Sequence, residues 1–360
     1  NDFIDRLRHA STQAILTRTD TIIVASVSCI YGLGNPAEYG DVSVQLRAGQ
    51  KIKQNDFLRS LASLQYERNE TEQKAGTFSV KGEIIEIVSP TGMETTRLEF
   101  FGNEIESINK GEVQEIKLFP AKHFVVEHST LERAIAAIEQ ELEEHLKKLQ
   151  QQGKALEAER LRQRTRFDME MLRTTGYCSG IENYSRHISR RAAGTPPSTL
   201  LDYFSSAAGT AGFLVFIDES HMTVPQIRGM YHGDHARKEI LIEHGFRLPS
   251  ALDNRPLTFK EFEERTAQTV YVSATPSPFE LLGIPTSEQI VRPTGLLDPE
   301  IEIRPTKNQI HDVTREIKKR ADAGERTLVT TITKRLAEDI AEYLQQEKLR
   351  AAYIHADVKT

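Results

Sequence analysis

The segment Phe213-Leu-Val-Phe-Ile-Asp-Glu-Ser-His221 decides how the rest of the 360-residue chain is interpreted. Its first residues, Phe213–Ile217, are all apolar, which is typical of a strand buried in a parallel sheet. Asp218 and Glu219 follow directly, at the carboxyl end of the predicted strand, where open α/β sheets bind their ligands. Two adjacent carboxylates at this edge predict a site for Mg²⁺, because hard cations prefer oxygen ligands.

A second apolar strand is predicted at Thr269–Ser273, and it runs into the tripeptide Ser273-Ala-Thr275. In NTPases, the first acid of such a pair holds Mg²⁺, often through water, and the second orients or deprotonates the attacking water. The order Asp-Glu-x-His followed by Ser-Ala-Thr is typical of superfamily 2 helicases. It predicts that Asp218 and Glu219 bind Mg²⁺ and ATP, while the hydroxyls of Ser273 and Thr275 hydrogen-bond near them.

A phosphate-cradling loop of the form G-x-x-x-x-G-K-[ST] does not occur in the sequence. Gly153-Lys154 is the only Gly-Lys pair, and it lacks both the preceding glycine and the following Ser or Thr. We therefore expect the chain alone to hydrolyse no ATP. Because the first residue is Asn1 rather than methionine, we expect a fragment with sequence missing on its N-terminal side.

The first 122 residues change character along their length. Residues 3–20 predict an amphipathic helix, and Thr21–Ser28 predicts a buried parallel strand. From about residue 40, short β-type runs separated by turn signals predict a mainly-β insertion with one helix at Asn55–Glu67. Its strands are predicted at Val42–Leu46, Thr77–Lys81, Glu83–Val88, Thr96–Phe101 and Val113–Phe119.

Residues 129–172 carry leucine and isoleucine at helical spacing and predict a helical hairpin that turns at Gly153. The acids of Glu139–Glu144 are interpreted as a solvated face. The stretch from Arg160 to Arg191 contains eight arginines and three acidic residues, which gives it a local charge of +5 in a chain of net charge −6. A nucleic-acid contact would need a local basic patch of this kind.

Residues 301–360 alternate between strand and helix patterns, which predicts the start of a second doubly wound domain after a linker at Arg292–Asp298. Strands are predicted at Ile301–Arg304, Thr327–Thr331 and Ala351–His355, and helices at 310–323 and Arg335–Glu347. The predicted domains are therefore 1–38, 39–122, 123–211, 212–291 and 292–360. No apolar run suggests a membrane helix, and the two cysteines, Cys29 and Cys178, are expected to be reduced thiols of a cytoplasmic protein.

Several long strings resemble the UvrB family of bacterial nucleotide excision repair, and together they cover essentially the whole chain. They are Val24–Gly34, Gly176–His187, Ile217–Asp234, His244–Pro256, Tyr271–Pro276, Val291–Pro299 and Thr330–Arg335. The resemblance implies an incomplete superfamily 2 helicase motor of the RecA-like P-loop type, with inserted β and helical domains. It also implies damage verification after loading by UvrA, ATP and Mg²⁺ as cofactors of the complete protein, and recruitment of UvrC. The phosphate loop, a strand-separating β-hairpin and the UvrC-contacting region would lie outside this chain.

The resemblance also implies partner-binding residues. The β insertion matches the UvrA-contacting domain, with Arg68, Lys81, Arg97 and Glu99 at matching positions, while Ser79 and Ala75 stand where the family pattern has arginine. That departure bears on the strength of UvrA binding, and a plain surface role for Arg68 and Arg97 is the alternative. Contacts to damaged DNA are implied for Arg164, Arg166, Tyr177, Asn183, Tyr184, Arg186 and His187, since arginine binds phosphates and tyrosine stacks on exposed bases. For each of these, packing or a salt bridge within the protein is the alternative.

Two other functions stay open. One is a different superfamily 2 motor, such as a restriction translocase or the transcription–repair coupling factor, which shares a UvrA-contacting domain. The strings His244–Pro256 and Val291–Pro299 argue against it. The other is a binding module that contacts UvrA without being an enzyme, and ATPase activity of the isolated chain would discriminate.

Overall fold

The computed structural model describes residues 2–125, 128–209, 212–266, 268–283, 285–291, 295 and 297–358. The chain forms two compact units, Asn1–Thr286 and Ser287–Thr360. Part of the predicted linker Arg292–Asp298 and the predicted boundaries at 211 and 292 fall outside the described residues. None of the helices in the described ranges is both long enough and apolar enough to cross a membrane.

The N-terminal helix α1 (Asp2–Thr17) confirms the predicted amphipathic helix, with His9, Thr12 and Ile15 on its buried side. The strand predicted at Thr21–Ser28 is wrong. Residues 21–26 have no regular structure, Ile22 and Val24 are 90% and 97% exposed, and a short 3-10 helix, η1 (Val27–Ile30), follows. A strand needs a neighbour to complete its backbone hydrogen bonds, and none pairs with this segment among the described residues.

The predicted β insertion forms a five-stranded sheet in the order β2-β3-β4-β5-β6. Its strands are β2 (Glu67–Arg68), β3 (Thr77–Lys81), β4 (Ile84–Val88), β5 (Thr95–Phe101) and β6 (Glu104–Ile108). A separate antiparallel ladder joins β1 (Val44–Arg47) to β7 (Glu115–Leu118). Three of the predicted strands appear as β3, β4 and β5 and two as the ladder, whereas β2 and the polar β6 were not predicted.

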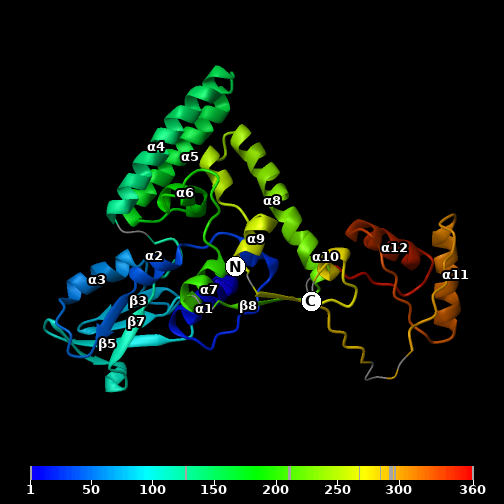
Figure 1. The fold of residues 1–360 in the computed structure, drawn as a ribbon, viewed down its shortest axis with the longest axis horizontal. Helices are drawn as coiled ribbons and strands as arrows, with labels where there is room; N and C mark the ends of the chain where they lie inside the picture. Colours follow the sequence, from blue (N-terminus) through cyan, green and yellow to red (C-terminus); the bar gives the residue numbers. More distant parts are fainter. Residues whose placement is uncertain are drawn as a thin grey trace. The chain divides into compact units, whose positions relative to one another are not determined.

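Local turns and a packed helix hold this sheet together. Gly82 and Gly102 have positive φ angles of 64° and 62° and make the tight turns between β3 and β4 and between β5 and β6. Helix α3 (Gln54–Ser63) packs its buried Phe57 and Leu61 into the same core as Ile85 and Leu98. Figure 1 shows α3 lying along this sheet.

The predicted helical hairpin is confirmed as α4 (His128–Gln151) and α5 (Ala155–Thr175), with Gly153 in the turn at φ 74°. Ile135, Ile138 and Leu161 lie in its core. Shorter elements pack beneath the hairpin and beside α1. They are α2 (Pro36–Asp41), η3 (Ile181–Tyr184), α6 (Ser185–Ile188), α7 (Leu200–Ala208) and η5 (Pro249–Asp253). The short helix η2 (Asn109–Gly111) instead follows β6 and contacts β5 and β6.

The two strands predicted to carry the acidic pair and the Ser-Ala-Thr tripeptide are confirmed as β8 (Leu214–Ile217) and β9 (Gln268–Tyr271). They pair in parallel, with Ile217 opposite Tyr271. The crossover between them contains α8 (Ser220–Glu243) and α9 (Phe259–Arg265), and α10 (Pro278–Leu281) follows β9. This parallel pair with crossover helices fits the predicted α/β class.

The second unit contains helices α11 (Gln309–Asp322) and α12 (Lys334–Gln346), as predicted. The three strands predicted at 301–304, 327–331 and 351–355 are wrong, because these segments join no sheet. Ile303, Leu328 and Ile354 are 93%, 88% and 78% exposed. Apolar runs form parallel strands only between neighbouring strands, and the described part of this unit offers helices as neighbours. Arg304 instead pairs with Asp312 at 3.2 Å and Glu316 at 3.0 Å on α11.

Candidate functional site

The acidic pair Asp218-Glu219 and the tripeptide Ser273-Ala-Thr275 lie at the same edge of the parallel pair β8–β9. Hydrogen bonds continue past the strands: the Val272 amide donates to the Ile217 carbonyl at 2.9 Å, and the Ser220 amide donates to the Val272 carbonyl at 3.0 Å. The structure therefore brings together the two motifs that the sequence places on separate strands.

The backbone at Glu219 has φ 44° and ψ 50°, a left-handed conformation that costs a non-glycine residue about 1–2 kcal/mol. Its amide donates to Oδ1 of Asp218 at 3.0 Å, and the hydroxyl of Thr223 donates to the Asp218 carbonyl at 2.8 Å. The Glu219 carboxylate is exposed at the start of α8, where the helix dipole favours negative charge. Both carboxylates are thus available to a cation or a water molecule.

His221 joins the two motifs, although sequence reasoning assigned it no role. Its Nδ1 lies 2.8 Å from Oγ of Ser273 and 3.5 Å from the Glu219 carboxylate. Oγ of Ser273 in turn accepts a hydrogen bond from the Thr275 amide at 3.1 Å. The available signal was the position of His221 at the end of the Asp-Glu-x-His pattern.

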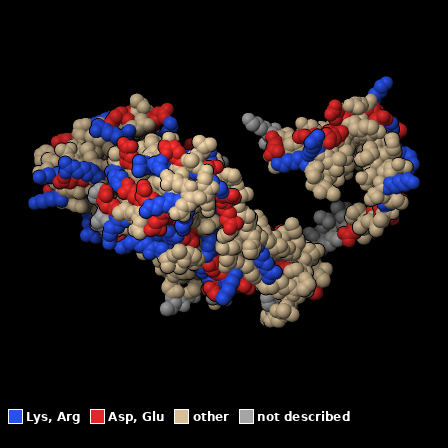
Figure 2. All heavy atoms as spheres, turned by 90° about the horizontal axis from the view of Figure 1, so that it is seen from above, with Lys and Arg blue, Asp and Glu red and all other residues tan. Residues whose placement is uncertain are grey.

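The basic stretch Arg160–Arg191 is largely neutralised inside the protein. Arg173 pairs with Glu139 at 2.8 Å, and Arg166 lies 3.7 Å from Glu143. The interpretation of the α4 acids as a solvated face fits Glu143, whose side chain is 59% exposed, but it is wrong for Glu141, which is 13% exposed and accepts the Ser250 amide. Figure 2 shows basic and acidic side chains interspersed over the visible face of the first unit.

The residues predicted to contact DNA occupy different environments. Arg164 donates to Asp168 and to the Ser179 carbonyl, both at 3.0 Å, yet keeps 45% of its side chain exposed. Arg166 is 64% exposed. Tyr177 is half-buried, with Nζ of Lys122 lying 5.5 Å from its ring centre.

The rest of this set makes contacts within the protein. The buried Tyr184 hydroxyl donates to Asp168 at 2.7 Å, and Nδ2 of Asn183 donates to the Gly180 carbonyl at 2.8 Å. Arg186 donates to Asp253 at 3.1 Å, and Nε2 of His187 lies 2.6 Å from Glu141. Burial alone would raise the pKa of Glu141, but hydrogen bonds from His187 and Ser250 lower it.

The residues predicted to contact UvrA gather on the five-stranded sheet. In the register of β4 and β5, Arg97 stands opposite Glu86, and Arg97 Nε donates to Glu99 at 3.0 Å. The hydroxyl of Ser107 donates to Glu99 at 2.7 Å. The hydrogen bond from Ser107 and, to a smaller extent, the one from Arg97 lower the pKa of Glu99.

The edge of the same sheet is more open. Arg68, on the edge strand β2, is exposed and donates to Glu70 at 2.7 Å. Lys81 is exposed at the end of β3, whereas Ser79, one of the two departures from the family pattern, is buried. Arg68 and Lys81 therefore present the two accessible cations of the predicted set.

Asp5, His9 and His123 place possible metal-ligand atoms within 4.8 Å of one another. The two imidazoles are stacked, with ring centres 3.9 Å apart and an interplanar angle of 18°. An imidazole binds a metal in its ring plane, and an ion bound in the plane of one of two stacked rings lies outside the plane of the other. Burial lowers the pKa of His9 to about 4 and that of His123 well below its usual value. We assign this cluster a packing role.

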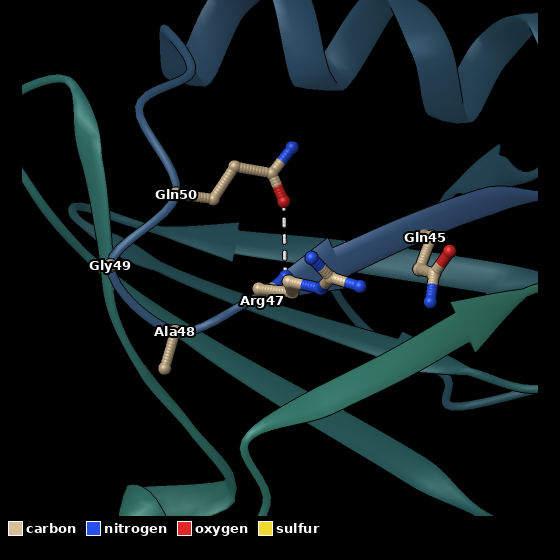
Figure 3. A pocket seen from close by; sticks show the side chains of 5 residues that line it. All are labelled: Gln45, Arg47, Ala48, Gly49 and Gln50. Carbon is tan, nitrogen blue, oxygen red and sulfur yellow. Dashed lines mark hydrogen bonds between the residues drawn. The ribbon is translucent and has the colours of Figure 1, made fainter.

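A shallow hollow lies at the turn after β1, lined by Gln45, Arg47, Ala48, Gly49 and Gln50. Figure 3 shows the Gln50 side chain folded back over this turn, where its oxygen accepts a hydrogen bond from the Arg47 amide at 3.0 Å. Arg47 also pairs with Glu115 at 2.9 Å. The arrangement closes a turn and gathers no set of groups for chemistry.

Fold and site define an α/β protein that carries an inserted β domain and an inserted helical hairpin beside an acidic turn. Two family models match those insertions: the UvrB interaction domain at residues 44–124 and the UvrB third helical domain at residues 129–190. The chain therefore carries two domains of the UvrB family.

Curated relatives match along the whole chain. The UvrABC system protein B of Geobacillus kaustophilus is 54% identical over 371 residues, which cover 100% of this chain and 56% of that protein. That of Staphylococcus aureus strain N315 is 53% identical over 371 residues, covering 100% of this chain and 55% of that protein. The chain thus spans little more than half the length of the curated relatives it matches.

Proposed function

We propose that this protein acts in nucleotide excision repair as a UvrB-type component, which verifies DNA damage after loading by UvrA and recruits UvrC. The observation that carries the proposal is the combination, in one chain, of a UvrB interaction domain with the joined motifs Asp218-Glu219 and Ser273-Ala-Thr275. The names of the relatives support the pathway.

Within this proposal, β8, β9 and their helices belong to a first RecA-like motor domain, and the second unit belongs to another. Asp218 would hold Mg²⁺ through water, and Glu219 would orient or deprotonate the water that attacks the γ-phosphate of ATP. Bound Mg·ATP would supply the charge and leaving group of phosphoryl transfer. Ser273, Thr275 and His221 would link this turn to the rest of the motor, and the phosphate loop would come from residues outside this sequence.

The contacts on DNA follow from exposure. Arg164 and Arg166 keep exposed guanidinium groups on α5 and are the members of the predicted set best placed for phosphates. Tyr184 serves instead to fasten η3 to α5, and Arg186 and His187 fasten α6 to η5 and α4. Their substitution would weaken DNA binding only by loosening the fold.

Binding of purified UvrA to this chain tests the partner half of the proposal. We compare the wild type with Arg68→Ala/Lys81→Ala and with a control, Arg59→Ala/Lys51→Ala, which removes two other exposed cations of the same domain. We expect the first pair to weaken binding by about tenfold or more, and the control to leave it unchanged. A folded wild-type chain that does not bind UvrA at micromolar concentration would remove UvrA from the proposal.

A second candidate, a UvrA-binding module without enzymatic activity, is favoured by the match to the UvrB interaction domain at residues 44–124. ATP turnover measured with the flanking sequence present separates the two, because a UvrB-type motor that has its phosphate loop would hydrolyse ATP and a binding module would not. We expect no turnover by the isolated chain and Glu219-dependent turnover when its flanking sequence is present.

A further inference from the structure

Glu280 is a buried carboxylate that sequence analysis did not single out. It lies in the four-residue helix α10, which follows the Ser273-Ala-Thr275 segment, and only 5% of its surface is exposed. One of its oxygens accepts a hydrogen bond from the Ser220 hydroxyl, and the other accepts one from the Ser277 amide at 2.5 Å. Burial alone would raise the pKa of Glu280, but these bonds lower it, so the carboxylate is charged at neutral pH.

Ser220 is the residue directly after Glu219, and it is fully buried. Its amide donates to the Val272 carbonyl at 3.0 Å, and its hydroxyl lies 3.2 Å from the same carbonyl. Ser220 is thus fixed by the backbone beyond β9 and by the Glu280 carboxylate. Since a left-handed backbone at a non-glycine residue persists only where its surroundings enforce it, this fixed point explains how Glu219 keeps its conformation.

Helix α10 is itself held in place, so Glu280 is a firm anchor. The Phe279 ring packs edge-on against Tyr271 and Phe259, with ring centres 6.0 Å and 5.5 Å apart. The guanidinium carbon of Arg228, on α8, lies 4.4 Å from the ring centres of both Phe259 and Phe279. Two successive residues of α10 therefore contact α8, one through a charged hydrogen bond and one through a cation–π contact.

We propose that Glu280 is a positioning residue for ATP hydrolysis, holding Glu219 through Ser220 in the conformation that orients the attacking water. The inference rests on the proposed function and extends it to a residue outside both motifs. Because Glu280 is buried, it acts through Ser220 and not on the nucleotide. Loss of its charge would let the Asp218-Glu219 turn relax while leaving the phosphate-binding groups in place.

Steady-state ATPase kinetics test this role in the protein with its flanking sequence present. The variants are Glu280→Gln, Ser220→Ala and the double variant, with Glu263→Gln on the exposed side of α9 as the matched control. We expect each single variant to lower kcat by about tenfold to a hundredfold, the scale of a small misplacement of a reacting group. The KM for ATP should change by less than about threefold, because binding energy common to ground and transition states is retained.

The double variant separates positioning from general damage. If Glu280 acts through Ser220, the double variant loses no more activity than the worse single variant, whereas independent effects would multiply. An unchanged kcat in Glu280→Gln, or multiplied losses in the double variant, would overturn the proposal. Ser220→Ala carries the test if Glu280→Gln fails to fold, as judged by its melting temperature.

Two further readouts keep the failures distinguishable. If the wild type hydrolyses no more ATP than Glu219→Gln, the proposed ATPase function fails and this inference falls with it. Hydrogen exchange in the chain as it stands reports the tie itself: we expect the Ser220 amide to exchange faster in Glu280→Gln than in the wild type. Equal exchange would show that Glu280 does not hold the turn, whatever the activity.

Discussion

The five-stranded sheet and the second unit carry the same kind of sequence pattern and have opposite outcomes. In the sheet, the predicted strand residues Ile85 and Leu98 are fully buried. In the second unit, Leu328 and Ile354 also come from apolar runs, yet both are largely exposed and neither lies in a sheet formed by the described residues. The difference lies in where each strand finds its partner.

Strands β3 to β6 are consecutive in sequence and pair antiparallel across short turns, so each partner is supplied locally. Parallel strands need a crossover connection and neighbours distant in sequence. The segment 21–28 behaves like those of the second unit, whereas β8 and β9 pair because both strands and their crossover are present. In these cases, a strand predicted from an apolar pattern forms only where a second strand pairs with it.

The largest expected effect compares two leucines, one on each side of this difference. Leu98→Ala should lower the free energy of unfolding by about 2–5 kcal/mol, because it leaves a cavity in a closed core. Leu328→Ala should change it by no more than about 0.5 kcal/mol, as at other exposed positions. Urea denaturation followed by circular dichroism measures both, and equal losses would erase the distinction between the two regions.

A second pair of variants compares Gly153, in the turn of the helical hairpin, with Gly245, which packs closely against Glu157 of α5. Gly245 and Gly153 have similar φ angles of 67° and 74°, so alanine should cost each about 1–2 kcal/mol of stability. A Cβ at Gly245 would also lie 2.2 Å from the Glu157 carbonyl oxygen, whereas one at Gly153 meets no atom within 4 Å. We expect Gly245→Ala to cost about 1–3 kcal/mol more than Gly153→Ala in thermal unfolding. Matching losses would mean that α5 yields to the intruding methyl group.

The smallest expected effect is on the pH dependence of stability, and it compares one carboxylate from each unit. Burial alone would raise the pKa of Glu261, but hydrogen bonds from Arg255 and Thr258 lower it to about 2. In the second unit, hydrogen bonds from Arg304 and Arg320 lower the pKa of Glu316 to about 2. Both carboxylates therefore contribute stability that is complete above pH 4.5 and is lost as the pH falls from 4.5 towards 2.

Glu261→Gln and Glu316→Gln should each reduce the fall in melting temperature between pH 7 and pH 3. The reduction should be larger for Glu261, because its carboxylate also accepts the Thr258 amide at the start of α9 and pairs with the buried Arg255. Glu316 sits in an exposed network, where solvent screens the charges. A larger effect at Glu316 would contradict this ranking.

The sequence was sufficient for some features because they follow from general rules of chain geometry. Asp218 and Ser273 could be placed together because the carboxyl ends of neighbouring parallel strands meet at one edge. Helices α4 and α5 could be placed from their spacing. Both predictions start from patterns that are visible within the individual strands and helices.

Other features depend on partners that no local pattern reveals. Glu280 bonds to Ser220 across sixty residues, and Arg186 bonds to Asp253 across 67. Whether an arginine or a histidine stays exposed or is enclosed by its own chain depends on how the elements pack, so the largely buried Arg186 and His187 could not be separated in advance from the more exposed Arg164 and Arg166. Strand β6 was missed because its alternating polar residues carry a weak apolar signal, although Ile105 is fully buried.

Helix α8 starts at the residue after the acidic pair and ends at Glu243, where Lys154 of the hairpin turn pairs with that glutamate at 3.0 Å. Arg160 of α5 bonds to the carbonyl of the next residue, His244, and stacks on Phe246. With 24 residues, α8 is a rod about 36 Å long that joins the acidic turn to the hairpin (Figure 1). A tilt of about 5° at the acidic end would move the far end of a rod of this length by about 3 Å, so α8 would convert a small motion beside Asp218 into a larger displacement beside the hairpin turn.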